Sequence, residues 1–262
     1  MMKIAHEAPL SIFSKVQALT DYDYALVHLF EENEDYYRVF KDAVDSGREV
    51  ILDNSIFELG TAFDGEQYVK WIEKLKPTWY IVPDVLDRGI ETALSFASFM
   101  KLFPNLPGKA IGVAQGSTFE DFVQCYEFMS TNDKVAKIGL SFNMPWMIEE
   151  AEGSNKYFKM VNGRRALLKR MVDEKIINEN KPHHLLGCGL PQEFIPYHDY
   201  KWIDSVDTSN PVIHGLKNIR YTESGLDDKE TVKLFTLIEE DVVDKWADIE
   251  YNIKMFRSFC NG

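Results

Sequence analysis

Long apolar segments are missing from this chain. Its 262 residues contain no apolar run near the roughly 20 residues that a membrane-spanning helix needs. The opening residues, Met1 to His6, lack the extended apolar region of a signal peptide. We therefore expect a soluble, cytoplasmic protein with no membrane partner.

Cysteine is also scarce, with only Cys125, Cys188 and Cys260. An odd number of widely spaced cysteines favours neither a disulfide framework nor a zinc site of clustered thiolates. The histidines show no metal-binding spacing such as His-Glu-x-x-His, and no nucleotide-binding fingerprint occurs. The sequence therefore predicts free thiols, no metal and no cofactor.

Positive charge is in deficit, because 29 Lys and Arg face 42 Asp and Glu for a formal net charge of −13. This balance excludes a protein that coats nucleic acid through a broad positive field. One segment departs from it, since residues 156–170 carry basic side chains and no acidic one. These side chains are Lys156, Lys159, Arg164, Arg165, Lys169 and Arg170. The segment fits either a solvated helix face or a local nucleic-acid contact.

What the chain does have is an alternation of short apolar runs and helix-length amphipathic segments, which is typical of parallel βαβ units. The predicted strands are Met2–His6, Tyr24–Phe30, Glu49–Asp53, Trp79–Asp84, Ala110–Gln115, Ala136–Ser141, His184–Gly187 and Trp202–Ser205. Eight such units predict an α/β fold with a (β/α)8 TIM-type barrel, and an open doubly wound sheet is the alternative. No linker or repeat interrupts the chain, so we expect residues 1–262 to form one domain.

Helical spacing of apolar residues predicts the helices between these strands. They cover Asp35–Ser46, Gly65–Leu75, Glu91–Leu102, Thr118–Met129, Phe158–Asn178 and Lys229–Phe259. The segment Asn143–Gly163 is too long for an ordinary βα loop, so we expect an insertion there, at the active-site mouth. A second irregular stretch, Thr208–Leu226, follows the last predicted strand.

Polar residues end several of the predicted strands, namely Asp53, Asp84, Gln115, Ser141 and Asp204. In a parallel barrel these ends converge on one face, where catalytic residues lie. A single Asp in such a place is commonly a helix N-cap. Three Asp and one Gln at corresponding strand ends favour an active site instead.

These strand ends belong to a longer series of motifs. In order, the motifs are Asp53-Asn54-Ser55-Ile56-Phe57, Pro83-Asp84, Gly112-Val113-Ala114-Gln115-Gly116, Gly139-Leu140, His184-Leu185-Leu186-Gly187-Cys188-Gly189-Leu190-Pro191 and Asp204-Ser205. The ordered set resembles the motifs of the tRNA-guanine transglycosylase superfamily, and the likeness spans most of the predicted barrel.

The resemblance implies a role for each matching residue. Asp204 would be the nucleophile that attacks C1′ of the sugar, and Asp53 would be the general acid/base. The base would be bound by Asp84, Gln115, Gly139, Leu140 and Phe57. Base exchange with retention needs two displacements, hence a nucleophile and a second carboxyl, about 5 Å apart by analogy with retaining glycosidases. Asp207 is the alternative nucleophile, although the Asp-Ser match favours Asp204.

The chain departs from the family pattern in three ways. The chain lacks the cysteine-rich zinc subdomain and the basic segment with which the tRNA enzymes read the anticodon loop, and Ser55-Ile56 replaces the glycine pair expected after the general acid. A short chain without zinc looks more like the bacteriophage 7-deazaguanine DNA transglycosylases, which act in the host cytoplasm. DNA is therefore favoured over tRNA as the partner, and Lys156–Arg170 is the candidate phosphate contact.

We thus expect a transglycosylase that replaces guanine in a polynucleotide by a 7-deazaguanine base. Two alternatives stay open. One is base exchange or hydrolysis on free nucleosides or nucleotides, which the acidic net charge suits better. The other is a catalytically silent barrel that binds nucleic acid or serves as a partner subunit, against which the presence of both Asp53 and Asp204 argues. Monomer and homodimer are both compatible with the sequence.

Overall fold

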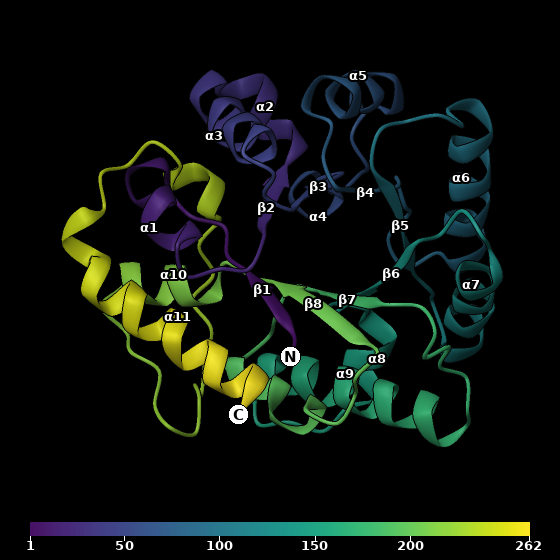
Figure 1. Ribbon diagram of the computed structural model, residues 1–262. Helices are drawn as coiled ribbons and strands as arrows, with labels where there is room; N and C mark the ends of the chain where they lie inside the picture. The colour runs from purple at the N-terminus through teal and green to yellow at the C-terminus, as the bar shows by residue number, and fades with distance from the viewer.

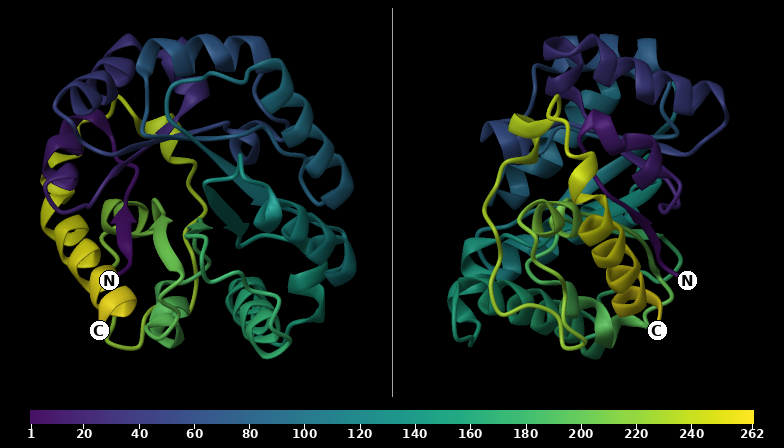
Figure 2. Two further views of the ribbon diagram at one scale, coloured as in Figure 1. Left: turned by 45° about the vertical axis from the view of Figure 1, so that its right-hand side comes forward. Right: turned by 90° about the vertical axis from the view of Figure 1, so that its left-hand side faces the viewer.

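Eight short parallel strands form the centre of the protein, and helices surround them (Figures 1 and 2). The computed structural model describes residues 1–262. The strands are β1 (Lys3–Ala5), β2 (Asp23–Leu26), β3 (Val50–Asp53), β4 (Trp79–Ile81), β5 (Lys109–Ala114), β6 (Lys137–Ser141), β7 (His183–Leu186) and β8 (Ile203–Asp207). Hydrogen-bonded neighbours follow chain order from β2 to β8, and β8 then pairs with β1. This arrangement confirms the predicted (β/α)8 TIM-type barrel.

The barrel is closed except at one seam, where β1 and β2 share no ladder of backbone hydrogen bonds. Asp21 bridges this seam just before β2. Its backbone N–H donates to the Ile4 carbonyl at 2.9 Å, and its carboxylate accepts from the Ile4 N–H at 2.8 Å. Arg257 also pairs with the Asp21 carboxylate at 3.0 Å. One residue thus supplies, with its backbone and its side chain, the partners that a neighbouring strand would otherwise offer.

The α-helices are α1 (Phe13–Gln17), α2 (Val27–Glu32), α3 (Glu34–Asp45), α4 (Ile56–Leu59), α5 (Gly65–Leu75), α6 (Gly89–Leu102), α7 (Phe119–Thr131), α8 (Pro145–Glu150), α9 (Lys156–Asp173), α10 (Asn210–Leu216) and α11 (Trp246–Asn261). Short 3-10 helices are η1 (Leu10–Ile12), η2 (Pro191–Tyr197), η3 (Leu234–Leu237) and η4 (Val243–Lys245). The predicted insertion at 143–163 consists of α8 and the start of α9.

Side-chain caps explain where four of the longer helices begin. Asn33, Asp64, Thr118 and Asn155 each accept a hydrogen bond from a backbone N–H in the first turn of α3, α5, α7 and α9, respectively. Such caps satisfy donors that the helix itself leaves open. These polar residues therefore set the helix starts directly after the barrel loops.

The predicted helix Lys229–Phe259 is wrong over its first half. Only α11 is a regular α-helix there, and residues 229–245 form an irregular segment with η3 and η4. Figure 2 shows this segment crossing the open end of the barrel. Its apolar residues Val232 and Leu234 pack in a small cluster with α10 and α11. Tertiary packing therefore overrides the helical spacing of its apolar residues.

One continuous core contains buried residues from Met2 to Cys260 and joins strands to helices. The two ends of the chain lie side by side (Figure 1), where the Met2 N–H donates to Asn261 Oδ1 at 2.8 Å. The three cysteines are buried free thiols, as predicted. None of the helices has the length and apolar character required to span a bilayer.

Candidate functional site

A cavity of about 410 Å³ opens at the carboxyl-terminal end of the strands, which we call the mouth. Most strands contribute to its wall. Leu26, Asp53, Ser141, Leu186 and Asp207 are the last residues of β2, β3, β6, β7 and β8, and all of them line the cavity. Loop residues just beyond the other strands complete it. This convergence of polar groups is the place where barrels of this type carry their ligand sites.

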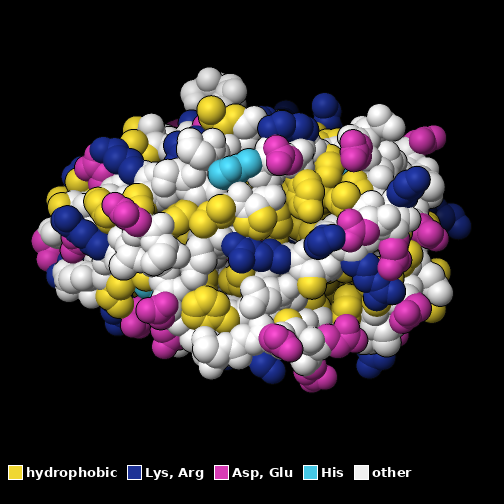
Figure 3. Space-filling model, turned by 90° about the horizontal axis from the view of Figure 1, so that it is seen from below, with side chains coloured by type: hydrophobic (Ala, Val, Ile, Leu, Met, Phe, Trp, Pro, Cys, Tyr) yellow, Lys and Arg dark blue, Asp and Glu magenta, His cyan; other side chains and the backbone are white.

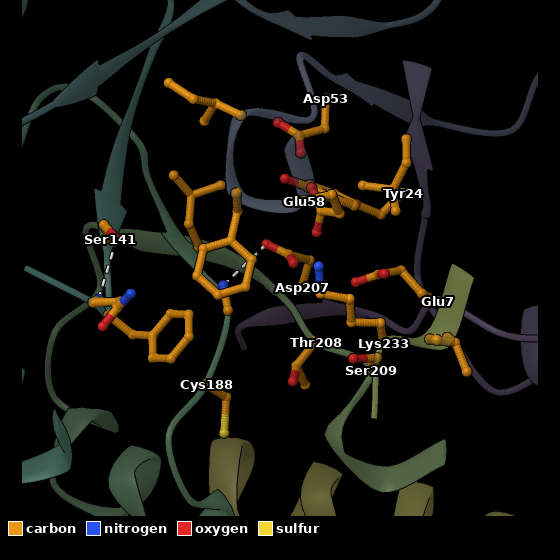
Figure 4. Close-up of a pocket in the computed structure, with 18 of the residues that line it drawn as sticks. Glu7, Tyr24, Asp53, Glu58, Ser141, Cys188, Asp207, Thr208, Ser209 and Lys233 are labelled. Carbon is orange, nitrogen blue, oxygen red and sulfur yellow. Dashed lines mark hydrogen bonds between the residues drawn. The ribbon is translucent and has the colours of Figure 1, made fainter. Parts of the chain in front are cut away.

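Asp53 ends β3 and lies in a tightly ordered turn. Asn54 follows it, and its side-chain oxygen accepts the Ile56 N–H at 2.9 Å. Ser55 adopts a left-handed conformation with φ of 60°. That conformation is uncommon for a residue other than glycine and indicates a turn held by its surroundings. The turn points the Asp53 carboxyl into the cavity (Figure 4).

Three acidic side chains at the mouth favour the protonated form. Burial, followed by the charges of neighbouring carboxylates, raises the pKa of Asp53 and of Glu7 well above the usual range. Burial also raises the pKa of Glu58 to about 7. Figure 4 shows Glu7, Asp53 and Glu58 around one space with Asp207. Because burial and neighbouring like charges both disfavour ionisation, this group holds protons near neutral pH.

Asp207 lies in a different environment within the same cavity. Its Oδ1 is 3.0 Å from His184 Nε2 and accepts the Gly187 backbone N–H at 3.3 Å. Burial lowers the pKa of His184, which keeps that imidazole neutral. Asp207 is therefore oriented by the His184 ring and the Gly187 N–H, whereas Asp53 lies among carboxyls.

Asp84 and Gln115 form a second polar group in the cavity wall. Asp84 Oδ2 accepts from Gln115 Nε2 at 2.8 Å, and Asp84 Oδ1 accepts from Asn54 Nδ2 at 2.8 Å. Burial raises the pKa of Asp84, and these two hydrogen bonds oppose that rise. Each carboxylate oxygen has two lone pairs, so both can accept a further hydrogen bond from a ligand. The structure brings Asp53, Asp84 and Gln115 together, as the sequence indicates.

Lysines and aromatic rings complete the mouth. Lys156, Lys229 and Lys233 line the cavity, and Lys229 Nζ donates to the Cys188 carbonyl at 2.6 Å. The Phe57 side chain is 56% exposed, and its ring lies 5.7 Å from that of Phe142. Phe57 therefore lies at the mouth, as expected, with an accessible ring face.

Asp204 does not lie at the mouth, so this expectation from the sequence is wrong. Strand β8 runs on to Asp207, and Asp204 is its second residue, about 10 Å back along the strand. There it pairs with Lys137 Nζ at 2.6 Å, at the amino-terminal end of the barrel. The predicted strand stops at Ser205, whereas β8 continues to Asp207, which is in register with Ala5 at the end of β1. Asp204 is also the extra residue of a bulge, because His183 pairs with Ile203 whereas His184 pairs with Ser205.

Gly139 and Leu140 also lie away from the cavity. Both are inside β6, paired with neighbouring strands, and the Leu140 carbonyl accepts from Arg164 at 3.3 Å. Ser141, Phe142 and Asn143 line the cavity in their place. The predicted backbone contacts are therefore shifted toward the strand end by one to three residues.

The basic segment 156–170 is divided by its surroundings. Only Lys156 lines the cavity. Lys159, three residues later, is partly buried and is not part of the cavity lining. Arg164 is fully buried against Glu193, and Arg165 donates to backbone carbonyls of η2. The guanidinium groups of Arg164 and Arg165 are thus bound to internal partners, and the buried Arg164 is inaccessible to the phosphate that the sequence suggested.

The other two basic residues lie far along the same helix. Lys169 and Arg170 pair with Asp173 and Glu174 one turn later, on exposed positions. Thirteen residues of α-helix separate Lys169 from Lys156, which is about 20 Å. On the face seen in Figure 3, Lys and Arg side chains alternate with Asp and Glu and form no continuous basic patch. The prediction of a nucleic-acid contact at Lys169 and Arg170 therefore gains no support here.

Sequence reasoning did not single out Glu7, Glu58, Lys229, Lys233 or His184 as site residues. Glu7 lies two residues after β1, a position equivalent to the other strand ends, and could have been found in that way. Glu58 belongs to α4, a single turn directly after Asp53. The two lysines enter from the irregular segment before α11, which the apolar spacing presents as a helix. No group of His, Cys, Asp and Glu side chains is arranged to hold a metal ion.

Comparison with known proteins does not assign this chain to a family. No family model matches the chain, and no curated protein matches it either. The site must therefore be interpreted from its own chemistry.

Proposed function

We propose that this protein is a base-exchanging transglycosylase that replaces guanine in a polynucleotide by a 7-deazaguanine base, with Asp207 as nucleophile and Asp53 as general acid/base. One observation carries the proposal. Two carboxyls end β3 and β8 in one cavity, and their surroundings differ. Burial and neighbouring carboxylates raise the pKa of Asp53, whereas Asp207 accepts from the Gly187 N–H and lies 3.0 Å from His184 Nε2. A retaining displacement at a sugar carbon requires two such carboxyls, one to donate a proton and one to attack.

The proposed reaction has two displacements at C1′. The Asp207 carboxylate attacks C1′ while the bond from C1′ to the purine nitrogen breaks, and protonated Asp53 gives its proton to the departing base. In the second displacement the Asp53 carboxylate removes the N–H proton of the incoming base. The nitrogen then attacks C1′ and releases Asp207, so that both carboxyls return to their starting states.

Base recognition is assigned to Asp84 and Gln115. The Asp84 oxygens accept the two N–H groups of a guanine N1/N2 edge, and the Gln115 amide donates to O6. The exposed ring of Phe57 offers a stacking surface beside them. A cavity of about 410 Å³ is within the range of small-ligand sites.

The phosphate contacts are assigned to Lys156, Lys229 and Lys233 rather than to the distant part of α9. These are the lysines of the cavity wall, and neither Lys156 nor Lys233 has a carboxylate within ion-pair distance. DNA is favoured over tRNA on the sequence resemblance alone. A base in duplex DNA would have to leave the stack to reach Asp207.

A second candidate function is exchange or hydrolysis on free nucleosides or nucleotides. Residues 229–235 all line the cavity and partly cover the mouth (Figure 2), which suits a small substrate. The formal net charge of −13 also opposes polynucleotide binding.

The test is incorporation of radiolabelled guanine into duplex DNA, single-stranded DNA and bulk tRNA, with guanosine hydrolysis measured in parallel. We expect incorporation into DNA by the wild type, loss of more than 1000-fold in Asp207→Asn, and a comparable loss in Asp53→Asn. Asp204→Asn is the matched control from the same strand and is expected to retain measurable exchange.

Each result distinguishes one of the hypotheses from the others. If Asp204→Asn abolishes exchange while Asp207→Asn retains it, the assignment of the nucleophile is wrong. Hydrolysis of guanosine without incorporation into any polymer selects the free-nucleoside alternative. Polymer binding without exchange or hydrolysis selects the catalytically silent alternative.

A further inference from the structure

A continuous line of hydrogen bonds runs through the barrel interior from its amino-terminal end to the mouth. Lys137 Nζ donates to Asp204 Oδ2 at 2.6 Å and to Ser205 Oγ at 3.2 Å. Ser205 Oγ lies 3.0 Å from His184 Nδ1, and His184 Nε2 lies 3.0 Å from Asp207 Oδ1. We call these five residues the axial chain.

The axial chain is placed where apolar side chains would be expected. Lys137, His184 and Ser205 are fully buried, at the centre of a barrel that side chains normally fill as a packed core. Burying the Lys137 ammonium costs desolvation free energy that its attraction to the partly exposed Asp204 carboxylate often fails to offset. A buried polar line of this length therefore calls for a role beyond stability, and its end at Asp207 indicates where that role lies.

The hydrogen bonds of the chain determine the tautomer of His184. Lys137 can only donate, so Ser205 Oγ accepts from it and has its own proton free to donate to His184 Nδ1. Asp207, as the proposed nucleophile, is a carboxylate that can only accept, so Nε2 carries the proton that faces it and Nδ1 of the neutral ring accepts from Ser205. The rings of Tyr24, stacked at 5.8 Å, and Tyr22, edge-on at 6.3 Å, hold the imidazole plane.

We propose that Lys137 and His184 are positioning residues, which orient the Asp207 carboxylate and present one N–H donor to it through the axial chain. The inference rests on the proposed function, because it takes Asp207 as the nucleophile. His184 fixes one oxygen of Asp207 and leaves the other free for C1′. Lys137 acts one step earlier by orienting Ser205, and Asp204 holds Lys137 in place.

The test in solution does not depend on catalysis. In protein with 15N-labelled histidine, the ring nitrogen shifts report which nitrogen carries the proton, and His184 is assigned by its loss in His184→Gln. We expect a single Nε2–H tautomer in the wild type and a changed Nδ1 shift in Ser205→Ala and Lys137→Met, because the bare Nδ1 loses its hydrogen-bond donor. An unchanged Nδ1 shift in both variants would overturn the axial chain, whether or not the protein exchanges bases.

The kinetic test uses the matched neighbour on β7. His184→Leu removes the donor to Asp207, and we expect kcat for base exchange to fall about 10- to 100-fold with little change in KM, the cost of one hydrogen bond to a charged group. His184→Gln, which keeps an N–H donor, should recover most of this loss. His183→Leu is the control, because His183 is equally buried but bonds Tyr126 outside the barrel interior.

The outcomes separate the two proposals. Equal kcat in His184→Leu and His183→Leu, with both folded by thermal melting, overturns the positioning role while base exchange stands. Absence of exchange in the wild type overturns the proposed function, and the nitrogen shifts then still decide whether the axial chain exists.

Discussion

At the scale of single residues, chemically identical carboxyls differ because of their neighbours. Burial opposes ionisation of Asp204, but the ion pair with Lys137 outweighs it and lowers the pKa of Asp204. Asp53 has no cation beside it and lies among carboxyls, so burial raises its pKa instead. At neutral pH only the Asp53 carboxyl, with its raised pKa, can donate a proton, although the sequence presents Asp53 and Asp204 as equivalent strand-end carboxyls.

The first prediction concerns Glu58, whose pKa is about 7 in the folded protein. Because folding raises this pKa, the folded state binds the proton more tightly. The associated stability is present below about pH 4.5 and is lost as pH rises through about 7. We expect Glu58→Gln to raise the free energy of unfolding at pH 8 by on the order of 1–3 kcal/mol, with little change at pH 4.

Urea unfolding at both pH values measures this difference, with the exposed Glu66→Gln as control. An equal effect of Glu58→Gln at both pH values would contradict the assigned cause.

The second prediction concerns the buried pair of Arg164 and Glu193, both fully buried. Arg164→Met leaves the Glu193 carboxylate without its cation, and we expect a loss of about 3–5 kcal/mol in the free energy of unfolding. Adding Glu193→Leu should restore part of this stability, since the uncompensated charge is removed. Denaturant unfolding of both single variants and the double variant checks this, and purely additive losses would argue against the pair.

At the scale of elements, small shifts of register decide which residues reach the mouth. The bulge at Asp204 lets β8 extend to Asp207 on the interior face with Ser205 and His184. Helix α9 begins at the mouth with Lys156 but carries Lys169 and Arg170 about 20 Å away. The turn between β5 and α7 is equally constrained, because it must place Gln115 against Asp84.

The third prediction tests that turn. A Cβ at Gly116 would clash with the Phe122 backbone nitrogen, so the backbone of α7 must shift. We expect Gly116→Ala to lower the free energy of unfolding by about 1–3 kcal/mol. The control is Gly65→Ala at the start of α5, where nothing lies within 4 Å and a gain of up to about 1 kcal/mol is expected. Chemical denaturation compares them, and equal effects would contradict the close approach.

At the scale of the whole molecule, the fold collects one group from nearly every strand into a single cavity while the surface stays acidic. The formal net charge is −13, and the lysines of the mouth are the cations nearest the proposed substrate. Polynucleotide binding, if it occurs through them, involves few phosphates.

The fourth prediction follows from that small number. With two or three phosphates contacted, the logarithm of the duplex-DNA binding constant should fall against the logarithm of salt concentration with a slope of about −2 to −3. Lys233→Gln should make the slope less negative by about 1, whereas Lys169→Gln should leave it unchanged. Fluorescence anisotropy over a salt series measures both slopes. A slope that changes only in Lys169→Gln would place the contact on α9 instead.

Features that depend on local periodicity agree between sequence and structure, and those that depend on tertiary packing do not. Strand and helix positions follow from local periodicity, so the eight predicted strands and five of the six predicted helices are confirmed within a few residues. Residues Val27–Phe30, predicted as part of a strand, belong to α2 instead. The segment 229–245 departs further, because packing across the mouth, rather than its own apolar spacing, determines its form. Asp53, Asp84 and Gln115 are placed together because strand ends in a parallel barrel must converge.

By itself, then, the sequence determined the barrel, the face that carries the polar strand ends and the free state of the cysteines, since these depend on patterns between neighbours in the chain. Only the tertiary structure decided that Asp207 rather than Asp204 reaches the mouth, that Arg164 is internal, and that Lys137 and His184 connect the two ends of the barrel. These depend on a bulge, on burial and on contacts between residues far apart in the sequence, and none of them leaves a periodic signal in the chain.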